Sequence, residues 1–375
     1  MLRTLKTLCL LNGISGNEDE VREYIKDRAL KYTDDVRTDR MGNLIVVKHA
    51  AGNCCAPAGQ NRCAAPGQNR CAAPGQNSGQ CRVKLPKLMI AAHMDEVGFM
   101  VTRITEKGYL GFAPVGGIDP RVVFNRRVYV GEKKLNGVTG LKAVHQTPAE
   151  LRTEIPKWPS MYIDIGAKDR AEAESLVQIG DSVAFHSDFV RFGKGDGFIK
   201  AKAIDDRYGC AVMLKLIEKD LPMDVTFVFT VQEEVGTRGA TAAAYSVAPD
   251  IALILEGTTS ADLAGVDGHK KVTRLGDGPV LGFMDAGSIY DRKLFEALRD
   301  LATENKLPWQ IKGRIAGGTD AAAVQRSRAG VRVASISAPV RSIHCPNSVA
   351  KISDLKQGLK LAELFIDAVA SGRIE

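Results

Sequence analysis

Two pairs of adjacent acidic residues border apolar segments of the chain. Glu233 and Glu234 follow the strand-like run 225–231, and Asp205 and Asp206 precede an apolar stretch typical of a helix. Buried neighbouring carboxylates repel each other and lose hydration, so such a pair is costly unless cations or protons neutralise it. N-capping of the helix would explain one aspartate comfortably and the other less well. A carboxylate can also bridge two cations, which offers a second use for this pair.

Two histidines and two further acids extend this set. In extended backbone alternate side chains share a face, so His93 and Asp95 can point the same way. Asp95 could then hold one imidazole nitrogen and leave the other free for a metal, although a hydrogen-bonded loop histidine is the simpler explanation of this pair alone. Glu256 follows the strand-like run 251–255, and His344 follows another apolar segment. All these groups are expected at neighbouring strand ends.

Together these side chains offer two imidazoles and several carboxylates. Borderline nitrogen and hard oxygen donors suit Zn²⁺, Co²⁺ or Mn²⁺. Two such ions about 3.5–4 Å apart can hold a water between them, lower its pKa and polarise a carbonyl. A carboxylate that binds neither ion could take the proton of this water and pass it to a leaving amine. The residues therefore indicate metal-assisted hydrolysis of an amide bond.

Strands and helices must alternate to bring these residues together. The sequence predicts helices and buried strands in alternation, with strands at 88–92, 225–231, 251–255 and 331–336 and helices at 18–31, 206–219, 290–304 and 354–371. This order is typical of an α/β layer with a largely parallel sheet, which binds ligands at the carboxyl ends of its strands.

The segment 103–194 has a different pattern. It is rich in short β-like runs separated by Gly, Asp and Pro, with one helix expected at 168–177. We therefore predict that a β-rich domain at 103–194 interrupts an α/β domain formed by 1–102 and 195–375.

An internal repeat with a period of eight residues occupies 54–81. It holds five of the eight cysteines, and its Pro-Gly pairs break both helix and strand. A spacing of eight matches no zinc pattern, so we expect a disordered or loosely ordered loop with reduced thiols.

Several segments resemble the M42 family of metallo-aminopeptidases, which includes the TET peptidases and proteins labelled glutamyl aminopeptidase or endoglucanase M. The similarity covers nearly the whole chain. It is carried by the segments Leu-Leu-Asn-Gly-Ile-Ser-Gly-Asn-Glu18, Ala-His93-Met-Asp95-Glu-Val-Gly, Ala-Ile-Asp205-Asp206-Arg-Tyr-Gly, Gln-Glu233-Glu234-Val-Gly, Glu256-Gly-Thr-Thr and Gly317-Gly-Thr-Asp-Ala321.

The resemblance implies a role for each of these residues. It implies that His93, Asp205 and Glu256 bind one metal ion. It implies that Asp205 also binds the second ion, together with Glu234 and His344. Glu233 matches the general base of the family, and Asp95 matches the partner that holds His93.

The resemblance also implies an architecture and a reaction. The expected fold is a three-layer zinc-peptidase-like α/β domain with an inserted β-rich dimerisation domain, in an assembly between a dimer and a dodecamer. The expected reaction is the removal of N-terminal residues from peptides, with Zn²⁺ or Co²⁺, and in some cases Mn²⁺, as the two ions.

Composition limits the classes of binding partner and the cellular location that we expect for this protein. The net charge of +7 comes from 51 basic and 44 acidic residues that are scattered along the chain, whereas a nucleic-acid binder concentrates its basic residues. No apolar run approaches the roughly 20 residues of a membrane span. The leucines of the first 11 residues alternate with basic residues, which is unlike a secretory signal and typical of an amphipathic helix. We expect a cytoplasmic enzyme that binds neither nucleic acid nor membrane.

Two other functions stay open at this point. In a glycoside hydrolase of the endoglucanase type, Glu233 and Glu234 would be the paired carboxylates, but the histidines would have no role. In an inactive peptide-binding scaffold a ligand or the base should be missing, and every one of them is present. Chelation separates the three, because EDTA should abolish only the activity of a metallopeptidase.

Overall fold

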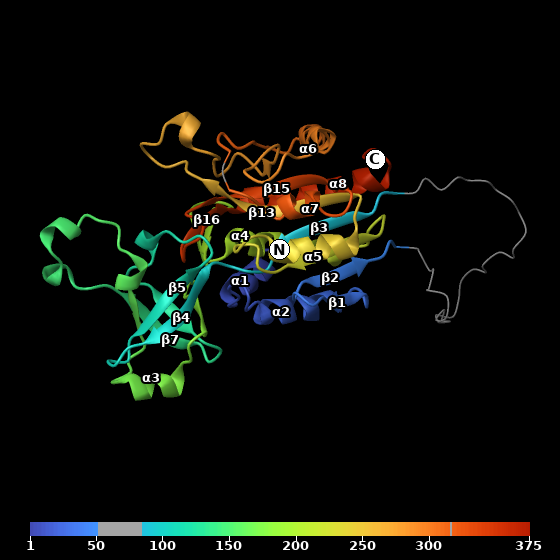
Figure 1. Ribbon diagram of the computed structural model, residues 1–375. Helices are drawn as coiled ribbons and strands as arrows, with labels where there is room; N and C mark the ends of the chain where they lie inside the picture. Colours follow the sequence, from blue (N-terminus) through green and yellow to red (C-terminus); the bar gives the residue numbers. More distant parts are fainter. Residues whose placement is uncertain (52–84, 316) are drawn as a thin grey trace, which may run out of the picture.

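A computed structural model describes residues 1–51, 85–315 and 317–375. The cysteine repeat at 54–81, and the loop conformation expected for it, lie outside these described residues. Two β assemblies organise the described chain, a large sheet covered by helices and a smaller closed barrel (Figure 1).

The large sheet is mixed. Its strands, in spatial order, are β1 (Val36–Thr38), β2 (Leu44–Lys48), β12 (Val225–Thr230), β3 (Leu88–His93), β13 (Ile251–Ser260), β15 (Arg332–Arg341), β16 (Ser348–Lys351), β11 (Phe198–Ala201) and β10 (Val190–Phe192), and β14 (Val280–Leu281) pairs with β15.

Only the centre of this sheet is parallel. β12, β3, β13 and β15 pair in parallel, whereas β1, β2, β16, β11, β10 and β14 join antiparallel. The expectation of a largely parallel sheet was therefore wrong in extent. Short connections such as β1–β2, β10–β11 and β15–β16 cannot make the crossover that parallel pairing needs.

Alternate residues of the central strands enter two hydrophobic cores. In β3, Leu88, Ile90 and Ala92 face one core, and Met89 and Ala91 face the other. The strand reads as a continuous apolar run because both of its faces are covered. A shift by one residue would exchange these faces, so the two cores fix the register that places the strand ends.

Helices cover both faces of the sheet (Figure 1). Those of the first core are α1 (Leu2–Leu10), α2 (Asp19–Ala29), α4 (Ile204–Ile217), α6 (Arg292–Glu304) and α8 (Ile352–Ala370); those of the second are α5 (Arg238–Val247) and α7 (Ala321–Gln325). The four helices predicted for the α/β part and the amphipathic helix at the first residues are all present. None of the described helices combines the length and the apolar composition that crossing a membrane requires.

The barrel closes around its own core. Its strands, in spatial order, are β4 (Gly98–Ile104), β5 (Leu110–Val115), β8 (Tyr162–Asp164), β7 (Leu135–Gly140), β6 (Arg127–Val130) and β9 (Ser182–Phe185). Phe99 packs edge-on against Phe112 and Phe185 within this core. Helix α3 (Arg170–Leu176) forms where a helix was expected. The barrel projects from one side of the helix-covered sheet (Figure 1).

Short 3-10 turns complete the described elements. They are η1 (Pro120–Val122), η2 (Val144–Gln146), η3 (Ala149–Leu151), η4 (Trp158–Ser160) and η5 (Gly268–Lys270).

Candidate metal centre

Six of the predicted site residues converge beside the ends of the central strands. His93 ends β3, and Glu233 and Glu234 follow β12. Asp205 is the second residue of α4, and its backbone angles are not helical. His344 lies in the turn between β15 and β16, with a positive φ of 58°.

Glu256 lies inside a strand rather than after one. We expected a strand that ends at Leu255, but β13 continues to Ser260, with Glu256 opposite Ser337 of β15. The residues after Glu256 include two threonines, which suit extended backbone. β13 stops pairing with β3 at Ile254, opposite Ala91, so Glu256 lies two residues beyond the last pair of these two strands.

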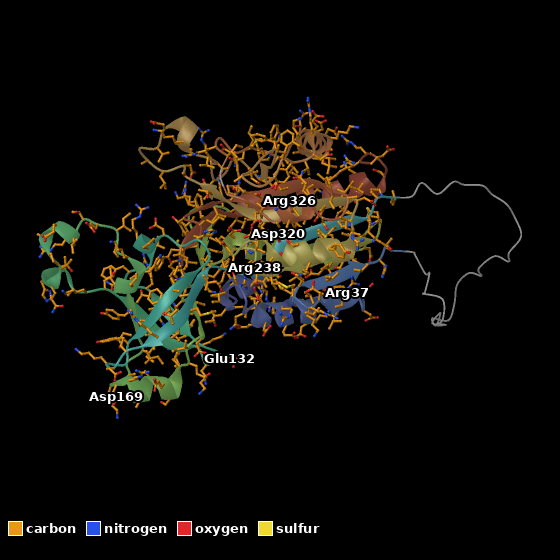
Figure 2. All side chains as sticks on the ribbon, in the orientation of Figure 1. Arg37, Glu132, Asp169, Arg238, Asp320 and Arg326 are labelled. Atoms are coloured by element: carbon orange, nitrogen blue, oxygen red, sulfur yellow. The ribbon has the colours of Figure 1, made fainter. Side chains whose placement is uncertain are left out.

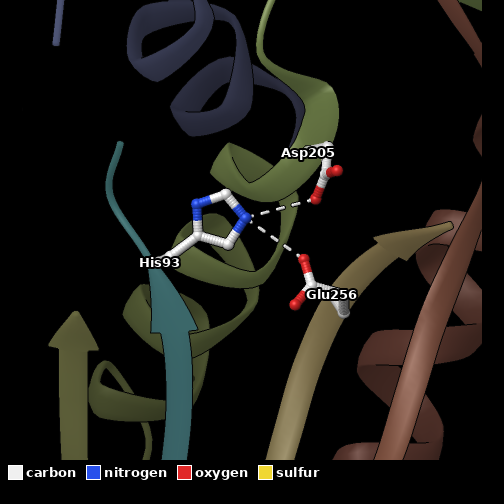
Figure 3. A group of neighbouring side chains, drawn as sticks. All are labelled: His93, Asp205 and Glu256. Carbon is white, nitrogen blue, oxygen red and sulfur yellow. Dashed lines mark ion pairs between the residues drawn. The ribbon is translucent and has the colours of Figure 1, made fainter. Parts of the chain in front are cut away.

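The first trio consists of His93, Asp205 and Glu256 (Figure 3). His93 Nε2 lies 3.4 Å from Asp205 Oδ1 and 3.2 Å from Glu256 Oε1. All three side chains are largely buried. One imidazole nitrogen and two carboxylates therefore face a common point.

The second trio consists of Asp205, Glu234 and His344. His344 Nε2 lies 3.2 Å from Glu234 Oε1 and 3.6 Å from Asp205 Oδ2. In each trio the potential ligand atoms all lie within 4.8 Å of one another.

Asp205 belongs to both trios through different oxygens. Its Oδ1 faces His93 and also accepts a hydrogen bond from the amide of Gly257 at 3.1 Å, while its Oδ2 faces His344. A Cβ at position 257 would approach Asp205 Oδ1 to 2.7 Å, so a glycine there leaves room for this carboxylate. The two oxygens can thus serve two adjacent cations.

Backbone carbonyls orient both imidazoles. Nδ1 of His93 lies 3.1 Å from the carbonyl oxygen of Asp95, and Nδ1 of His344 lies 2.8 Å from that of Gly117. A carbonyl can only accept, so Nδ1 carries a hydrogen in each ring, and in the neutral ring, the form that binds a metal, Nε2 keeps a free lone pair. Both free nitrogens point into the trios, as a metal ligand requires.

The carboxylate of Asp95 ties the centre together. It is fully buried, with Oδ1 3.4 Å from His93 Nδ1. Its two oxygens accept from the backbone amides of Glu233 and Glu234 at 3.0 and 3.1 Å, and Ser15 Oγ donates to Oδ2 at 2.6 Å. Asp95 therefore fixes the segment that carries the two glutamates as well as the imidazole.

The site contains more acidic than basic groups. Burial raises the pKa of Glu256 well above its usual value, and nearby Asp205 adds to this shift. Burial also raises the pKa of Glu233, and the carboxyls of Asp320 and Glu234 add to it. Within the described chain, Asp205, Glu234 and Glu256 form ion pairs with histidines alone.

Both imidazoles respond to this excess of acid. Burial lowers the pKa of His344, but hydrogen bonds to Asp205 and Glu234 outweigh it and raise the pKa to about 11. For His93, burial is likewise outweighed by Glu256 and Asp205, so its pKa lies well above the usual value. The cluster attracts positive charge, which two divalent cations on these donors would supply. The donor set and its spacing fit such a pair.

Three contacts of the site were not assigned from the sequence. Asp320, which directly precedes α7 and is labelled in Figure 2, accepts a hydrogen bond from Thr230 Oγ1 at 2.5 Å. Burial raises the pKa of Asp320 to about 6. The Gly-Gly-Thr-Asp motif indicated this loop but not the contact. Ser15 lies in another motif that carried no assigned role, and Gly117 acts through a backbone carbonyl that no residue type reveals.

Comparisons with known proteins identify the family of the chain. The model of the family described as M42 glutamyl aminopeptidase matches residues 76–361. The chain belongs to the M42 peptidase family. An M42 relative from Acetivibrio thermocellus is 36% identical over 364 residues, which cover 96% of this chain and 97% of that protein.

Solved structures of TET peptidases share the fold. A TET aminopeptidase from a marine sediment archaeon of the Thaumarchaeota is 31% identical, with a TM-score of 0.84 over 100% of this chain and 98% of that one. The TET1 peptidase of Pyrococcus horikoshii, which can assemble into a tetrahedron or a large octahedral shell, is 31% identical, with a TM-score of 0.77 over 97% and 98% of the two chains. This likeness establishes a mixed α/β fold of the TET aminopeptidase type.

Proposed function

We propose that this M42 member is a two-metal aminopeptidase that removes N-terminal residues from peptides. The single observation that carries the proposal is the division of Asp205 between two ligand trios, with one carboxylate oxygen directed to each. A site for one metal has no need of this arrangement. Membership of a family of aminopeptidases supports the choice of substrate.

The proposed ligands are divided by location. His93, Asp205 and Glu256 would hold one cation, and Asp205, Glu234 and His344 the other. Zn²⁺, Co²⁺ and Mn²⁺ all suit this set of two nitrogens and three carboxylates. When bound, such a pair lowers the pKa of a water held between the ions and polarises the substrate carbonyl.

Glu233 is proposed as the general base. Its backbone neighbours the ligand Glu234, and Asp95 holds the amides of both residues. Burial and the nearby charges of Glu234 and Asp205 raise the pKa of its carboxyl, while the charge of His93 opposes this shift. Because no ion pair occupies it among the described residues, it can accept the proton of the attacking water and deliver it to the leaving amine nitrogen.

The barrel is proposed as the core of an inserted dimerisation domain at 103–194, between the two parts of a three-layer peptidase domain. The segment 141–160 of this domain, between β7 and β8, exposes large apolar side chains, among them Val144 (68% exposed), Ile155 (57%) and Leu151 (47%). Exposed apolar groups of this kind mark association surfaces. The shells of the Pyrococcus TET1 peptidase support a homo-oligomer, for which light scattering is the test. The cytoplasmic location stays a prediction, which fractionation of the host cell would check.

Replacing Glu233 by Gln tests the mechanism. The variant keeps a similar shape but no carboxylate, so kcat on aminoacyl chromogenic substrates should fall by about 10²–10⁴-fold. Elemental analysis should still find two ions per chain. Glu132→Gln, an exposed change on the barrel (Figure 2), should leave both values unchanged. Metal loss from Glu233→Gln would make Glu233 a ligand instead of the base.

Chelation separates the competing functions. EDTA should abolish peptide hydrolysis, and Zn²⁺, Co²⁺ or Mn²⁺ should restore it. A glycoside hydrolase built on Glu233 and Glu234 would keep its activity in EDTA. An inactive scaffold would bind peptide but release no amino acid with any of the three metals.

A further inference from the structure

The segment Val231–Glu234 continues β12 beyond the end of the sheet. β12 pairs with β2 as far as Phe229, opposite Leu44, and with β3 as far as Thr230, opposite His93. Past these pairs neither neighbour continues the ladder. Buried backbone amides that lose their partners are costly, so this segment needs other acceptors.

Side chains from the N-terminal part of the chain supply two of them. The amide of Val231 donates to Asn43 Oδ1 at 3.0 Å, and the amide of Gln232 donates to Glu18 Oε1 at 3.1 Å. Asp95 accepts the next two amides, as described above. Four consecutive amides thus bond to side-chain oxygens where a strand would have offered carbonyls.

Both N-terminal acceptors are fixed in place. Asn43 is fully buried, and its Nδ2 donates to Asp39 Oδ2 at 2.7 Å and to the carbonyl of Gly239 at 2.9 Å. Glu18 is only 4% exposed, and the amide of Gly16 donates to its carboxylate at 2.7 Å. Neither side chain can turn away without breaking a second buried bond.

The backbone conformation of Gln232 is a further reason why its amide needs a fixed acceptor. Its φ of 55° lies in the left-handed region, which residues other than glycine seldom adopt. This turn decides where the side chains of Glu233 and Glu234 point. Glu18 bonds to the amide of the residue that makes the turn.

We propose that Glu18 and Asn43 are positioning residues for the Glu233–Glu234 segment. Through the amides of Val231 and Gln232 they fix the turn that directs one glutamate to the water and the other to a cation. The inference rests on the proposed function, because it assigns a purpose to the geometry of the base and the ligand. It gives the first 43 residues a part in the reaction although they hold no metal ligand.

Three substitutions of Glu18 separate positioning from charge. Glu18→Ala removes the acceptor, Glu18→Asp keeps the charge on a shorter arm, and Glu18→Gln keeps the acceptor without the charge. Glu23→Ala is the matched control, since Glu23 is an exposed acid of α2 whose carboxylate forms an ion pair with Lys26 alone among the described residues.

Activity and metal affinity are both measured. We expect Glu18→Ala and Glu18→Asp to lower kcat about 10-fold or more with KM within about 3-fold, because small displacements of reacting groups are costly. Their affinity for the ion of the trio that contains Glu234 should fall about 10-fold. Glu18→Gln should stay within about 3-fold of the unchanged chain in both values, and Glu23→Ala should equal it.

Two results would overturn the inference. One is Glu18→Gln as damaging as Glu18→Asp, because the charge and not the acceptor would then matter; this comparison decides even if the alanine variant fails to fold. The other is unchanged kcat and ion affinity in all three variants. If the unchanged chain cleaves no aminoacyl substrate with any of the three metals, the proposed function fails, and ion affinity alone then decides the positioning of Glu234.

Discussion

The two trios around Asp205 contain the same types of ligand, one histidine, one glutamate and the shared aspartate, but the fold holds them in different ways. His93 and Glu256 lie on central strands with both faces covered, and the His93 side chain is 1% exposed. Glu234 and His344 lie in turns after strands, and the His344 side chain is 30% exposed. The first trio is therefore set by the sheet register, and the second depends on hydrogen bonds to individual turns. We expect the strand-held ion to be retained longer than the turn-held ion.

The largest expected effect removes the residue that the trios share. Asp205→Ala should lose both ions, because neither trio keeps three protein ligands, and activity should fall by at least about 10³-fold. Elemental analysis after gel filtration measures the ions. Asp220→Ala, an exposed change beyond the end of α4, should keep two ions. One ion retained at full occupancy in Asp205→Ala would show that Asp205 does not bridge.

Chelation kinetics test the comparison directly. Exposure to EDTA should release the ions in two phases that differ at least about 10-fold in rate, because exposed turns open more readily than buried strands. His344→Ala should remove the faster phase and keep the slower one. Stopped samples analysed for metal content give both rates. A single phase, or loss of both ions from His344→Ala, would remove the distinction between the trios.

The smallest expected effect concerns the ion pair of Asp262 with Arg341, a residue close in sequence to the turn that carries His344. Arg341 ends β15 shortly before His344 and donates two hydrogen bonds to Asp262, at 2.5 and 2.7 Å. Burial raises the pKa of Asp262, but the bonds from Arg341 and the Leu275 amide outweigh it, so the pKa is lowered to about 2. The stabilisation is complete above about pH 4 and is lost as the pH falls towards 2.

Asp262→Asn should therefore lower the free energy of unfolding by about 1 kcal/mol at pH 7, since solvent screens part of this pair. The difference from the unchanged chain should shrink by pH 3. Urea unfolding in the presence of EDTA at both pH values measures it. Asp277→Asn, which removes only an exposed ion pair with Arg274, should have no effect. An equal loss at both pH values would mean that packing and not charge stabilises this corner.

The same contrast explains how far the sequence could predict the site. Continuous apolar runs predicted β3, β12 and β13, because strands covered on both faces are apolar throughout. The acids and the imidazole beside these runs were then the candidate ligands. His93, Glu233, Glu234 and Glu256 were noticed in this way, whereas Asp205 was noticed from the acidic pair before a helix and His344 from its place after another apolar segment. The extension of β13 past Glu256 was missed, because an acidic residue followed by a glycine is atypical of a strand interior.

Contacts between distant segments could not be predicted. Glu18 and Asn43 accept amides far along the chain, and their roles depend on which strands stop pairing first. Nothing in a local pattern reveals that point. The antiparallel edges of the sheet escaped prediction for a similar reason, since pairing depends on how short connections fold back and not on the strand residues themselves.

The hydrogen bond from His344 Nδ1 to the carbonyl of Gly117 crosses from the sheet to the segment that follows β5 of the barrel. One ligand of the turn-held trio is thus oriented by the smaller β unit. A shortened enzyme made by excising that unit would retain every proposed ligand, yet this imidazole would be free to rotate. Any association that tilts the barrel would likewise displace this imidazole, and with it one proposed ligand of the second cation.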